Sequence, residues 1–366
     1  MNEIELTQEL VRINSENPPG NEIGVARYIK DFLEGLKIPA EIIEFEKNRC
    51  DVVASIGDGK GLMLNGHMDT VPAGDASKWK YDPFEARLVG GKIYGRGTSD
   101  MKGGIASVLA AVQSLKNEKF KGRLLLAFVA DEETGQSGSE YLLTKRRELL
   151  KGIKYGVLSD SNDLQITIAQ KGLVHIKVTF KGKAAHGSTP ELGDNAIYKA
   201  TDFISELRKL MIKLDKVKNP VLGRGTINVG TIRGGTKINL VPDSCSLEID
   251  RRTIPGETVS LVVGQIRKII RKMKIDADVQ IENSRMPMQI SEKSELVTLL
   301  SEITGARTSA STGYMESEMY TKAGIPCVNF GPGVDSQAHV TNEYVPVKNL
   351  KIATRAYEKL IRKVCL

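Results

Sequence analysis

The chain has 366 residues, of which 40% are hydrophobic, 27% charged and 5% aromatic, as in ordinary globular proteins with an ample core. Its net charge of +7 comes from basic residues interleaved with apolar ones at helical spacing, which indicates solvated helix faces. The few scattered aromatics argue against a nucleic-acid partner. No run of 18 apolar residues is present, so no membrane span is predicted.

The four cysteines lie far apart and form no CxxC pair. This spacing favours reduced thiols over a disulfide framework or a zinc knuckle. The N-terminus is acidic and amphipathic and does not resemble a signal peptide. We therefore expect a cytoplasmic protein.

The first part of the chain alternates helical and strand patterns. Helices are predicted over residues 3–15, 23–36 and from about 101, and strands over 42–45, 52–56, 61–65, 124–130 and 156–158. The run Leu124–Ala130 is continuously apolar, which is typical of a strand buried on both faces. These patterns predict a mostly parallel sheet with helices on both faces.

The pattern changes near residue 172. Strand, helix, two strands, helix and strand are predicted, over 174–180, 196–212, 226–232, 246–250, 259–272 and 277–282. This β-α-β-β-α-β order predicts a small antiparallel sheet with helices on one face. The first pattern returns after Pro287, with helices at 295–303, 315–323 and 350–364 and a strand at 327–330.

We therefore predict an α/β protein of two domains. A catalytic domain with a mostly parallel sheet comprises residues 1–173 and 284–366, and an inserted α+β domain comprises residues 174–283. Ligands of open parallel sheets bind outside the carboxyl ends of the strands.

Acidic and imidazole side chains follow several predicted strands and glycine-rich loops. They are His67, Asp100, Glu132, Glu133, Asp160 and His339. Asp100 closes the loop Gly95–Ser99 at a predicted helix start, where the helix dipole favours an ionised carboxylate. These donors suit Zn²⁺, with Mn²⁺ or Co²⁺ as alternatives, and two adjacent metals need a shared ligand.

The pair Glu132–Glu133 can divide its work between binding a metal and accepting a proton from water. Asp69, two residues after His67, is placed to orient that imidazole. His175 alternates with apolar neighbours, which favours a structural role.

Six motifs resemble the zinc-dependent amidohydrolases of peptidase family M20, which include acetylornithine deacetylase, succinyl-diaminopimelate desuccinylase and carboxypeptidase G. The matching stretches are Asn65–Pro72, Tyr94–Gly104, Asp131–Gly135, Gly331–Gly333 leading to Ala338–His339, Ala185–Pro190 and Ile249–Glu257. The first four stretches span both halves of the catalytic domain in family order, the last two match the family's inserted domain, and the resemblance covers nearly the whole chain.

The resemblance implies a centre of two divalent ions, Zn or else Co or Mn. His67 and Asp160 would bind one ion, Glu133 and His339 the other, and Asp100 would bridge them. Asp160 stands in Leu158–Asn162 where many relatives carry Glu-Pro-Thr, and Asp is a known alternative there.

The resemblance also implies roles in catalysis and substrate binding. Glu132 would be the general base that activates a metal-bridged water. His186 would help to hold the oxyanion in the partner subunit's active site. Asn239 and Arg252, with Arg251 as an alternative, would hold the substrate's carboxylate.

The expected substrate is a small N-acyl amino acid, or else a short peptide. Glu318 stands where relatives often carry Arg, so it either favours a cationic group, as in acyl-ornithine or acyl-lysine, or faces solvent. Two alternatives stay open: a dipeptidase, aminopeptidase or carboxypeptidase with the same centre, and a non-catalytic binding protein on the same scaffold. Relatives lead us to expect a homodimer through the inserted domain, which would also act as a lid.

Overall fold

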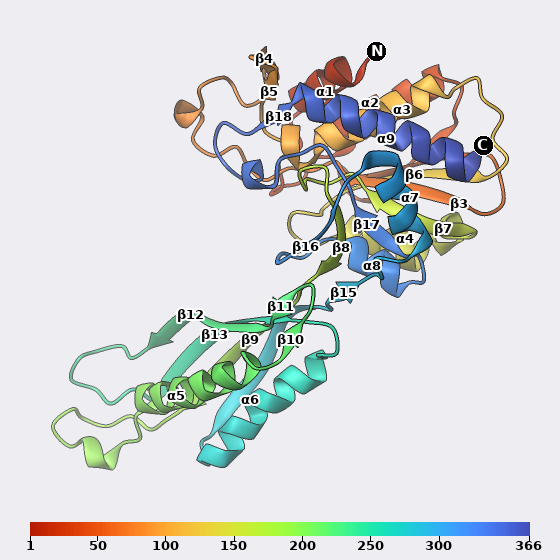
Figure 1. The fold of residues 1–366 in the computed structure, drawn as a ribbon. Coiled ribbons are helices and arrows are strands. Elements are labelled where there is room, and N and C mark those ends of the chain that lie inside the picture. The colour runs from red at the N-terminus through yellow and green to blue at the C-terminus, as the bar shows by residue number, and fades with distance from the viewer. The chain divides into compact units, whose positions relative to one another are not determined.

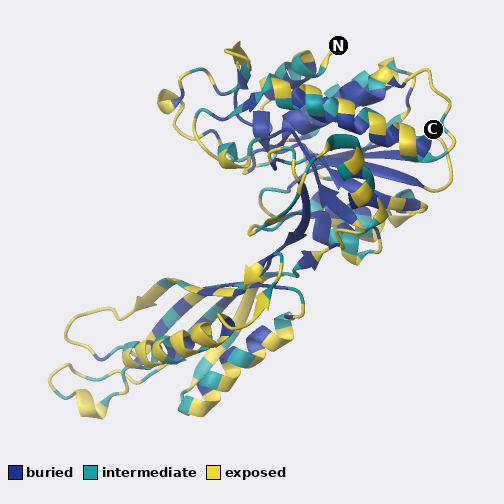
Figure 2. Cartoon of the chain, in the orientation of Figure 1, coloured by how far each residue is buried: buried dark blue, intermediate teal, exposed yellow.

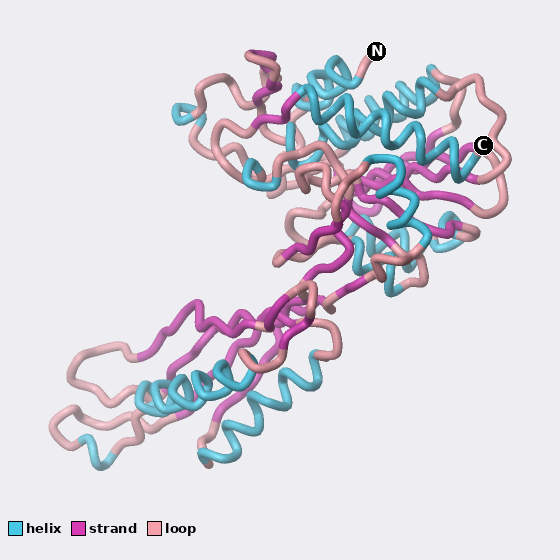
Figure 3. The backbone as a smooth tube through the Cα atoms, in the orientation of Figure 1, coloured by secondary structure: helices cyan, strands magenta, loops and turns pink.

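The computed structural model describes residues 1–366 and divides into two compact units (Figures 1 and 3). Unit 1 comprises Met1–Ile168, Ile290–Ser309 and Glu316–Leu366. Unit 2 comprises Ala169–Gln289 and Ala310–Met315. Unit 1 is therefore discontinuous in sequence.

A central sheet forms the middle layer of unit 1. Its strands are β1 (Ala40–Glu46), β2 (Arg49–Ile56), β3 (Gly61–His67), β6 (Arg123–Val129), β7 (Ile153–Leu158), β8 (Ile166–Gln170) and β17 (Cys327–Asn329). They lie in the order β1-β2-β6-β3-β7-β17-β8. The four middle strands β6, β3, β7 and β17 run parallel, and the pairs at either edge are antiparallel. The predicted fold class is confirmed, although β8 had no strand pattern that we recognised.

Helices cover both faces of this sheet (Figure 1). They are α1 (Glu3–Arg12), α2 (Ile23–Gly35), α3 (Gly103–Ser114), α4 (Ser137–Lys145), α7 (Glu295–Thr304), α8 (Ser317–Lys322) and α9 (Val347–Cys365). Helices α1, α3 and α9 pack together on one face, whereas α4 and α8 join the apolar cluster on the other. None of the helices is long and apolar enough to cross a membrane.

The apolar runs of the sequence explain why the middle strands of the sheet are buried. All seven residues of β3 are buried, and so are Leu124 to Val129 of β6 (Figure 2). Strands covered on both faces need no alternation of polar and apolar residues. The backbone of this layer is therefore a rigid base for side chains at its edge.

Short strands complete unit 1. The strands β4 (Arg87–Val89), β5 (Lys92–Tyr94) and β18 (Tyr344–Pro346) form a small antiparallel sheet, and β16 (Thr308–Ser311) pairs with β8. Three-residue strands carry too little periodicity to be recognised in a sequence.

Unit 2 contains the β-α-β-β-α-β order. Its elements are β9 (Gly172–Lys181), α5 (Ala196–Leu214), β12 (Thr226–Gly234), β13 (Ser244–Thr253), α6 (Val259–Met273) and β14 (Ala277–Arg285), with the short β10 (Lys218–Asn219), β11 (Gly223–Arg224) and β15 (Met288–Gln289). The main sheet is antiparallel, in the order β12-β13-β9-β14.

The core of unit 2 lies on one face of this sheet. Val174, Ile176, Val178 and Phe180 alternate along β9 and pack with apolar side chains of α5 and α6. The residues between them are partly exposed, as Figure 2 shows by the change of colour along the strand. Both helices therefore cover the same face, as the β-α-β-β-α-β order predicted.

Candidate metal centre

Three neighbouring parallel strands end at one edge of the central sheet. His67, the last residue of β3, lies opposite Val129, the last residue of β6. Asn65 of β3 lies opposite Leu158, the last residue of β7. The side chains that follow these strands therefore leave the sheet close together, at the edge where ligands of parallel sheets bind.

The five predicted ligand positions lie together in two groups of donor atoms. One group is His67, Asp100 and Asp160, and the other is Asp100, Glu133 and His339. Within each group the donor atoms lie within 4.8 Å of one another. Asp100 belongs to both groups, so its carboxylate stands where two ligand sets meet.

The two oxygens of Asp100 face different histidines. Oδ1 lies 3.0 Å from Nε2 of His67, and Oδ2 lies 3.3 Å from Nε2 of His339. His339 Nε2 also lies 2.9 Å from Oε2 of Glu133. His67 is buried and His339 is exposed, so the centre reaches from the interior to the surface.

Asp100 does not occupy the first turn of a regular helix, as its sequence context had suggested. It lies in the kinked segment Thr98–Lys102, with φ −123° and ψ 92°, and α3 begins at Gly103. The next residue, Gly104, lies so close to β7 that a Cβ atom there would be 1.9 Å from the carbonyl oxygen of Ser159. A glycine is required at this contact, which joins the start of α3 to the residue before Asp160.

The pKa values of the acidic and imidazole groups at this site indicate that negative charge is in excess there. Burial, followed by the negative charge of Asp100, raises the pKa of Asp160 to about 8 and also raises the pKa of Glu133. Burial, with neighbouring carboxylates, raises the pKa of Glu132 well above its usual value. Hydrogen bonds to Asp100 and Glu133 raise the pKa of His339 to about 10. Crowded carboxylates that resist ionisation are the environment that a bound cation relieves.

This donor set fits a pair of divalent ions. It offers two imidazole nitrogens and three carboxylates, with one carboxylate common to both groups. Zn²⁺, Mn²⁺ and Co²⁺ accept such nitrogen and oxygen donors. The number and type of side chains therefore match the requirement for a shared ligand.

The carboxylate of Asp69 mainly holds the backbone of the two glutamates. Oδ1 accepts a hydrogen bond from the N–H of Glu132 at 3.1 Å, and Oδ2 accepts one from the N–H of Glu133 at 3.2 Å. The nearest oxygen to Nδ1 of His67 is the backbone oxygen of Asp69 at 3.0 Å, whereas its carboxylate Oδ1 is 3.5 Å away. Asp69 thus contacts the imidazole and also fixes the adjacent acidic turn.

Sequence reasoning missed the network behind that turn. Asp131 has a left-handed φ of 68°, and its carboxylate accepts hydrogen bonds from Asn17 at 2.9 Å and Arg49 at 2.8 Å. Asn17 also donates to Oδ2 of Asp69 at 2.8 Å. Asn17 lies between the helices predicted over residues 3–15 and 23–36, and Arg49 has no motif around it. The Asp before the two glutamates was the one available signal.

Two acids of the segment around α8 are buried. Glu318 is 5% exposed, so the alternative that it faces solvent is wrong. Glu316, which sequence reasoning left out, is 2% exposed, and burial raises its pKa to about 8. Its negative charge is also one of the causes of the raised pKa of Glu132.

The remaining predicted residues belong to unit 2. His186 is exposed, and its Nδ1 lies 2.7 Å from Oγ of Ser188. The backbone oxygen of Asn239 accepts a hydrogen bond from Gly187, so Asn239 lies beside the loop of His186. Arg252 is partly exposed and pairs with Asp250 at 3.0 Å.

Arg251, the alternative to Arg252, is only 1% exposed. Its guanidinium forms an ion pair with Glu257 inside unit 2. Because the Arg251 guanidinium is buried with this partner, Arg252 is the more accessible of the two arginines.

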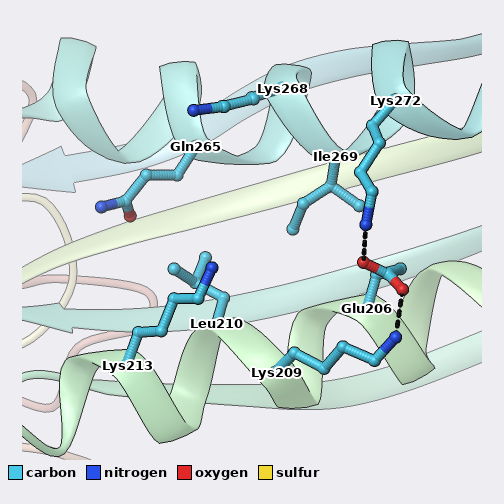
Figure 4. Close-up of a pocket in the computed structure, with 8 residues that line it drawn as sticks. All are labelled: Glu206, Lys209, Leu210, Lys213, Gln265, Lys268, Ile269 and Lys272. Carbon is cyan, nitrogen blue, oxygen red and sulfur yellow. Dashed lines mark hydrogen bonds and ion pairs between the residues drawn. The ribbon is translucent and has the colours of Figure 1, made fainter.

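A separate groove of about 370 Å³ lies between α5 and α6 (Figure 4). Four lysines line it, and Glu206 pairs with Lys209 and with Lys272. Its apolar side chains are Leu210 and Ile269, and no aromatic ring is among its lining residues. The groove has one carboxylate and no imidazole, so its chemistry differs from that of the metal centre.

Comparisons with known proteins agree with this geometry. Residues 63–363 match the family described as Peptidase family M20/M25/M40. A probable succinyl-diaminopimelate desuccinylase of Staphylococcus aureus (strain N315) is 30% identical and aligns over 93% of this chain and 92% of its own length.

Two solved structures show the same fold. A tripeptidase from Staphylococcus aureus subsp. aureus Mu50 is 25% identical with a TM-score of 0.80, covering 99% of this chain and 97% of its own. A dinuclear metal-binding peptidase of the M20 family from Bacillus subtilis is 18% identical with a TM-score of 0.73, covering 98% and 96%.

Proposed function

Because this chain belongs to peptidase family M20/M25/M40 and is a metal-dependent hydrolase, we propose that it cleaves the amide bond of small N-acyl amino acids. The observation that carries the proposal is the sharing of Asp100 between two groups of ligand atoms. One ion would be held by His67 and Asp160, the other by Glu133 and His339, and both by Asp100. When bound, the ions would supply Lewis-acid chemistry, lowering the pKa of water and stabilising an oxyanion.

Glu132 is the proposed general base. It follows β6 at the same edge as the ligands, and Asp69 holds its backbone N–H. Its raised pKa suits a carboxyl group that takes a proton and gives it back. In the proposed reaction Glu132 accepts the proton of the attacking water and then donates it to the leaving amine, so the base is regenerated.

The substrate class rests on the relatives and on one buried acid. The relatives named as probable desuccinylases support a succinyl or other acyl group on an amino acid. Glu318 is buried in unit 1, and an acid there favours a cationic substrate group, as in acyl-ornithine or acyl-lysine. A peptidase acting on short peptides is the second candidate, because a solved tripeptidase has the same fold.

The inserted domain, residues 174–283, is the proposed lid and dimerisation domain. Its edge strand β12 carries Ile232, which is 52% exposed, and such apolar exposure at a sheet edge suits a second copy of the chain. We further propose that His186 stabilises the oxyanion of the partner subunit, and that Arg252 and Asn239 bind the substrate carboxylate. Sedimentation analysis of the purified protein tests the dimer.

The location that we propose is the cytoplasm, since all four cysteines are free thiols in the fold. The function is tested on metal-stripped protein supplied with Zn²⁺, Co²⁺ or Mn²⁺ in turn. Hydrolysis of N-succinyl-diaminopimelate, N-acetylornithine, N-acyl-lysine, dipeptides and tripeptides is measured by release of the free amine. Turnover of an acylated amino acid above that of any peptide is expected. A peptide preference selects the second candidate, and preference for the succinyl substrate contradicts the cationic role of Glu318.

A further inference from the structure

One fully buried carboxylate accepts hydrogen bonds from the loop that carries Asp100. Glu343 is 0% exposed and comes directly before β18. Its Oε1 accepts hydrogen bonds from the backbone N–H of Ser99 at 2.7 Å and of Asp100 at 3.1 Å. Its Oε2 accepts one from the backbone N–H of Gly97 at 3.0 Å and one from Arg96 at 2.6 Å. Both oxygens are therefore saturated by donors from a single loop.

Further contacts tie the same two segments together. The N–H of Gly95 donates to the backbone oxygen of Glu343 at 3.0 Å, and Oγ of Ser99 donates to the backbone oxygen of Tyr344 at 2.8 Å. Arg96 is 3% exposed and lies 5.2 Å from the centre of the Trp79 ring. The Trp79 ring thus holds the arginine on the side away from Glu343. The ion pair between Arg96 and Glu343 therefore does not depend on a mobile surface cation.

The loop needs such a partner because it is not a regular helix. Backbone N–H groups that are buried without an acceptor destabilise the folded state. Three of these groups, from Gly97 to Asp100, point at the carboxylate of Glu343. One of these three N–H groups is that of Asp100 itself, whose side chain belongs to both ligand groups.

We propose that Glu343 is a positioning residue, which fixes Asp100 at the point where the two metal sites meet. His339 lies four residues earlier, so one segment supplies a ligand directly and sets the position of another. This inference rests on the proposed two-metal function and assigns a determinant of it to a residue that touches no metal.

The substitution Glu343→Gln tests the proposal with little change of volume. The new amide group turns N–H donors towards Arg96 or towards the loop amides, which are themselves donors. Loss of an outer partner of a metal ligand typically weakens metal affinity about 10–100-fold. We expect a loss of that size in Co²⁺ titrations against a competing chelator, together with changed d–d absorption bands. Circular dichroism and thermal unfolding of the metal-free variant check that it is folded.

The matched control is Glu257→Gln. Glu257 also pairs with a buried arginine, Arg251, and accepts a backbone hydrogen bond from Ile254 at 2.9 Å. This variant is expected to lose stability and to keep wild-type Co²⁺ affinity. An equal drop of metal affinity in both variants would show that general destabilisation, not positioning, is responsible.

A measurement on the wild-type protein covers the case in which Glu343→Gln does not fold. Hydrogen exchange of the metal-free protein is expected to be slow at the amides of Gly97, Ser99 and Asp100. Rapid exchange there, or Co²⁺ affinity within threefold of wild type in folded Glu343→Gln, overturns the inference. If wild-type protein binds no pair of ions, the proposed function fails; if it binds them and Glu343→Gln binds them equally, only the inference fails.

Discussion

The carboxylate of Asp69 accepts a hydrogen bond of 3.1 Å from the backbone N–H of Glu132. Asp69 follows β3 and Glu132 follows the neighbouring strand β6, so this bond holds the two strand ends together. The side chain of Glu132 is left available, because the contact uses only its backbone. Asp69 is buried, and hydrogen bonds from His67 and Asn17 outweigh the effect of burial and lower its pKa. Asp69 is therefore an ionised support for the proposed general base.

Substitution of Asp69 by Asn should disturb this support. An amide group in place of one carboxylate oxygen presents N–H donors to the N–H groups of Glu132, Glu133 or Asn17. We expect kcat to fall about 10–100-fold with the fold retained. Steady-state kinetics of this variant are compared with those of Asp75→Asn, which changes an exposed aspartate. Wild-type kcat in Asp69→Asn would contradict the supporting role.

Substitution of Glu132 by Gln removes the proposed proton acceptor without removing a predicted ligand. We expect two bound ions per chain, as in the wild type, and a loss of kcat of about 10³-fold, since general base catalysis contributes about 10²–10⁴-fold. Metal content and turnover are measured on the same sample. Near-normal turnover excludes Glu132 as the base.

Metal affinity should rise with pH. In the metal-free protein burial holds the proton on Asp160 up to a pKa of about 8, and hydrogen bonds to two carboxylates hold the proton on His339 up to about 10. Both protons must leave before these groups bind an ion. Chelator competition between pH 6 and 8.5 should show progressively tighter Zn²⁺ binding with proton release. A pH-independent affinity would contradict the prediction that ion binding displaces these protons.

Asp51 should make the metal-free protein less stable as pH rises. Burial raises its pKa to about 8, Oδ1 accepts a hydrogen bond from Ala130 at 3.0 Å, and Oδ2 is buried without a hydrogen-bond partner. Between the unfolded pKa of about 3.9 and the folded one, the native state holds the extra proton. The free energy of unfolding therefore falls as pH rises, by at most about 1.4 kcal/mol per unit from this group.

The variant Asp51→Asn keeps the acceptor for Ala130 and cannot ionise. Its free energy of unfolding, from urea titrations at pH 5 to 8.5, should increase relative to wild type as pH rises. The exposed Asp58→Asn serves as the control and should show no such trend. A constant difference between Asp51→Asn and wild type across this range would refute the interpretation.

The sequence predicted the architecture where apolar patterns were long. The buried runs of β3 and β6 and the alternation of β9 gave the correct elements, and the fold class is confirmed. Candidate ligands were found because strand ends such as His67 and Asp160 are local features. The kink that carries Asp100 was missed, since its glycine-rich loop resembles an ordinary helix start.

The supporting residues could not be predicted from local patterns. Asn17 and Arg49 contact the turn of the two glutamates from distant segments, and Glu343 contacts the distant loop of Asp100, through hydrogen bonds that leave no periodicity. The burial of Glu318 could not be predicted either, because it depends on how α8 packs against the sheet. Tertiary contacts alone determine such positions.

The shared position of Asp100 between two ions is tested by anomalous X-ray diffraction at the zinc absorption edge, from crystals of zinc-loaded protein. We predict two peaks about 3.5–4 Å apart, with one oxygen of Asp100 beside each. A single peak, or peaks away from the carboxyl ends of β3, β6 and β7, would contradict it.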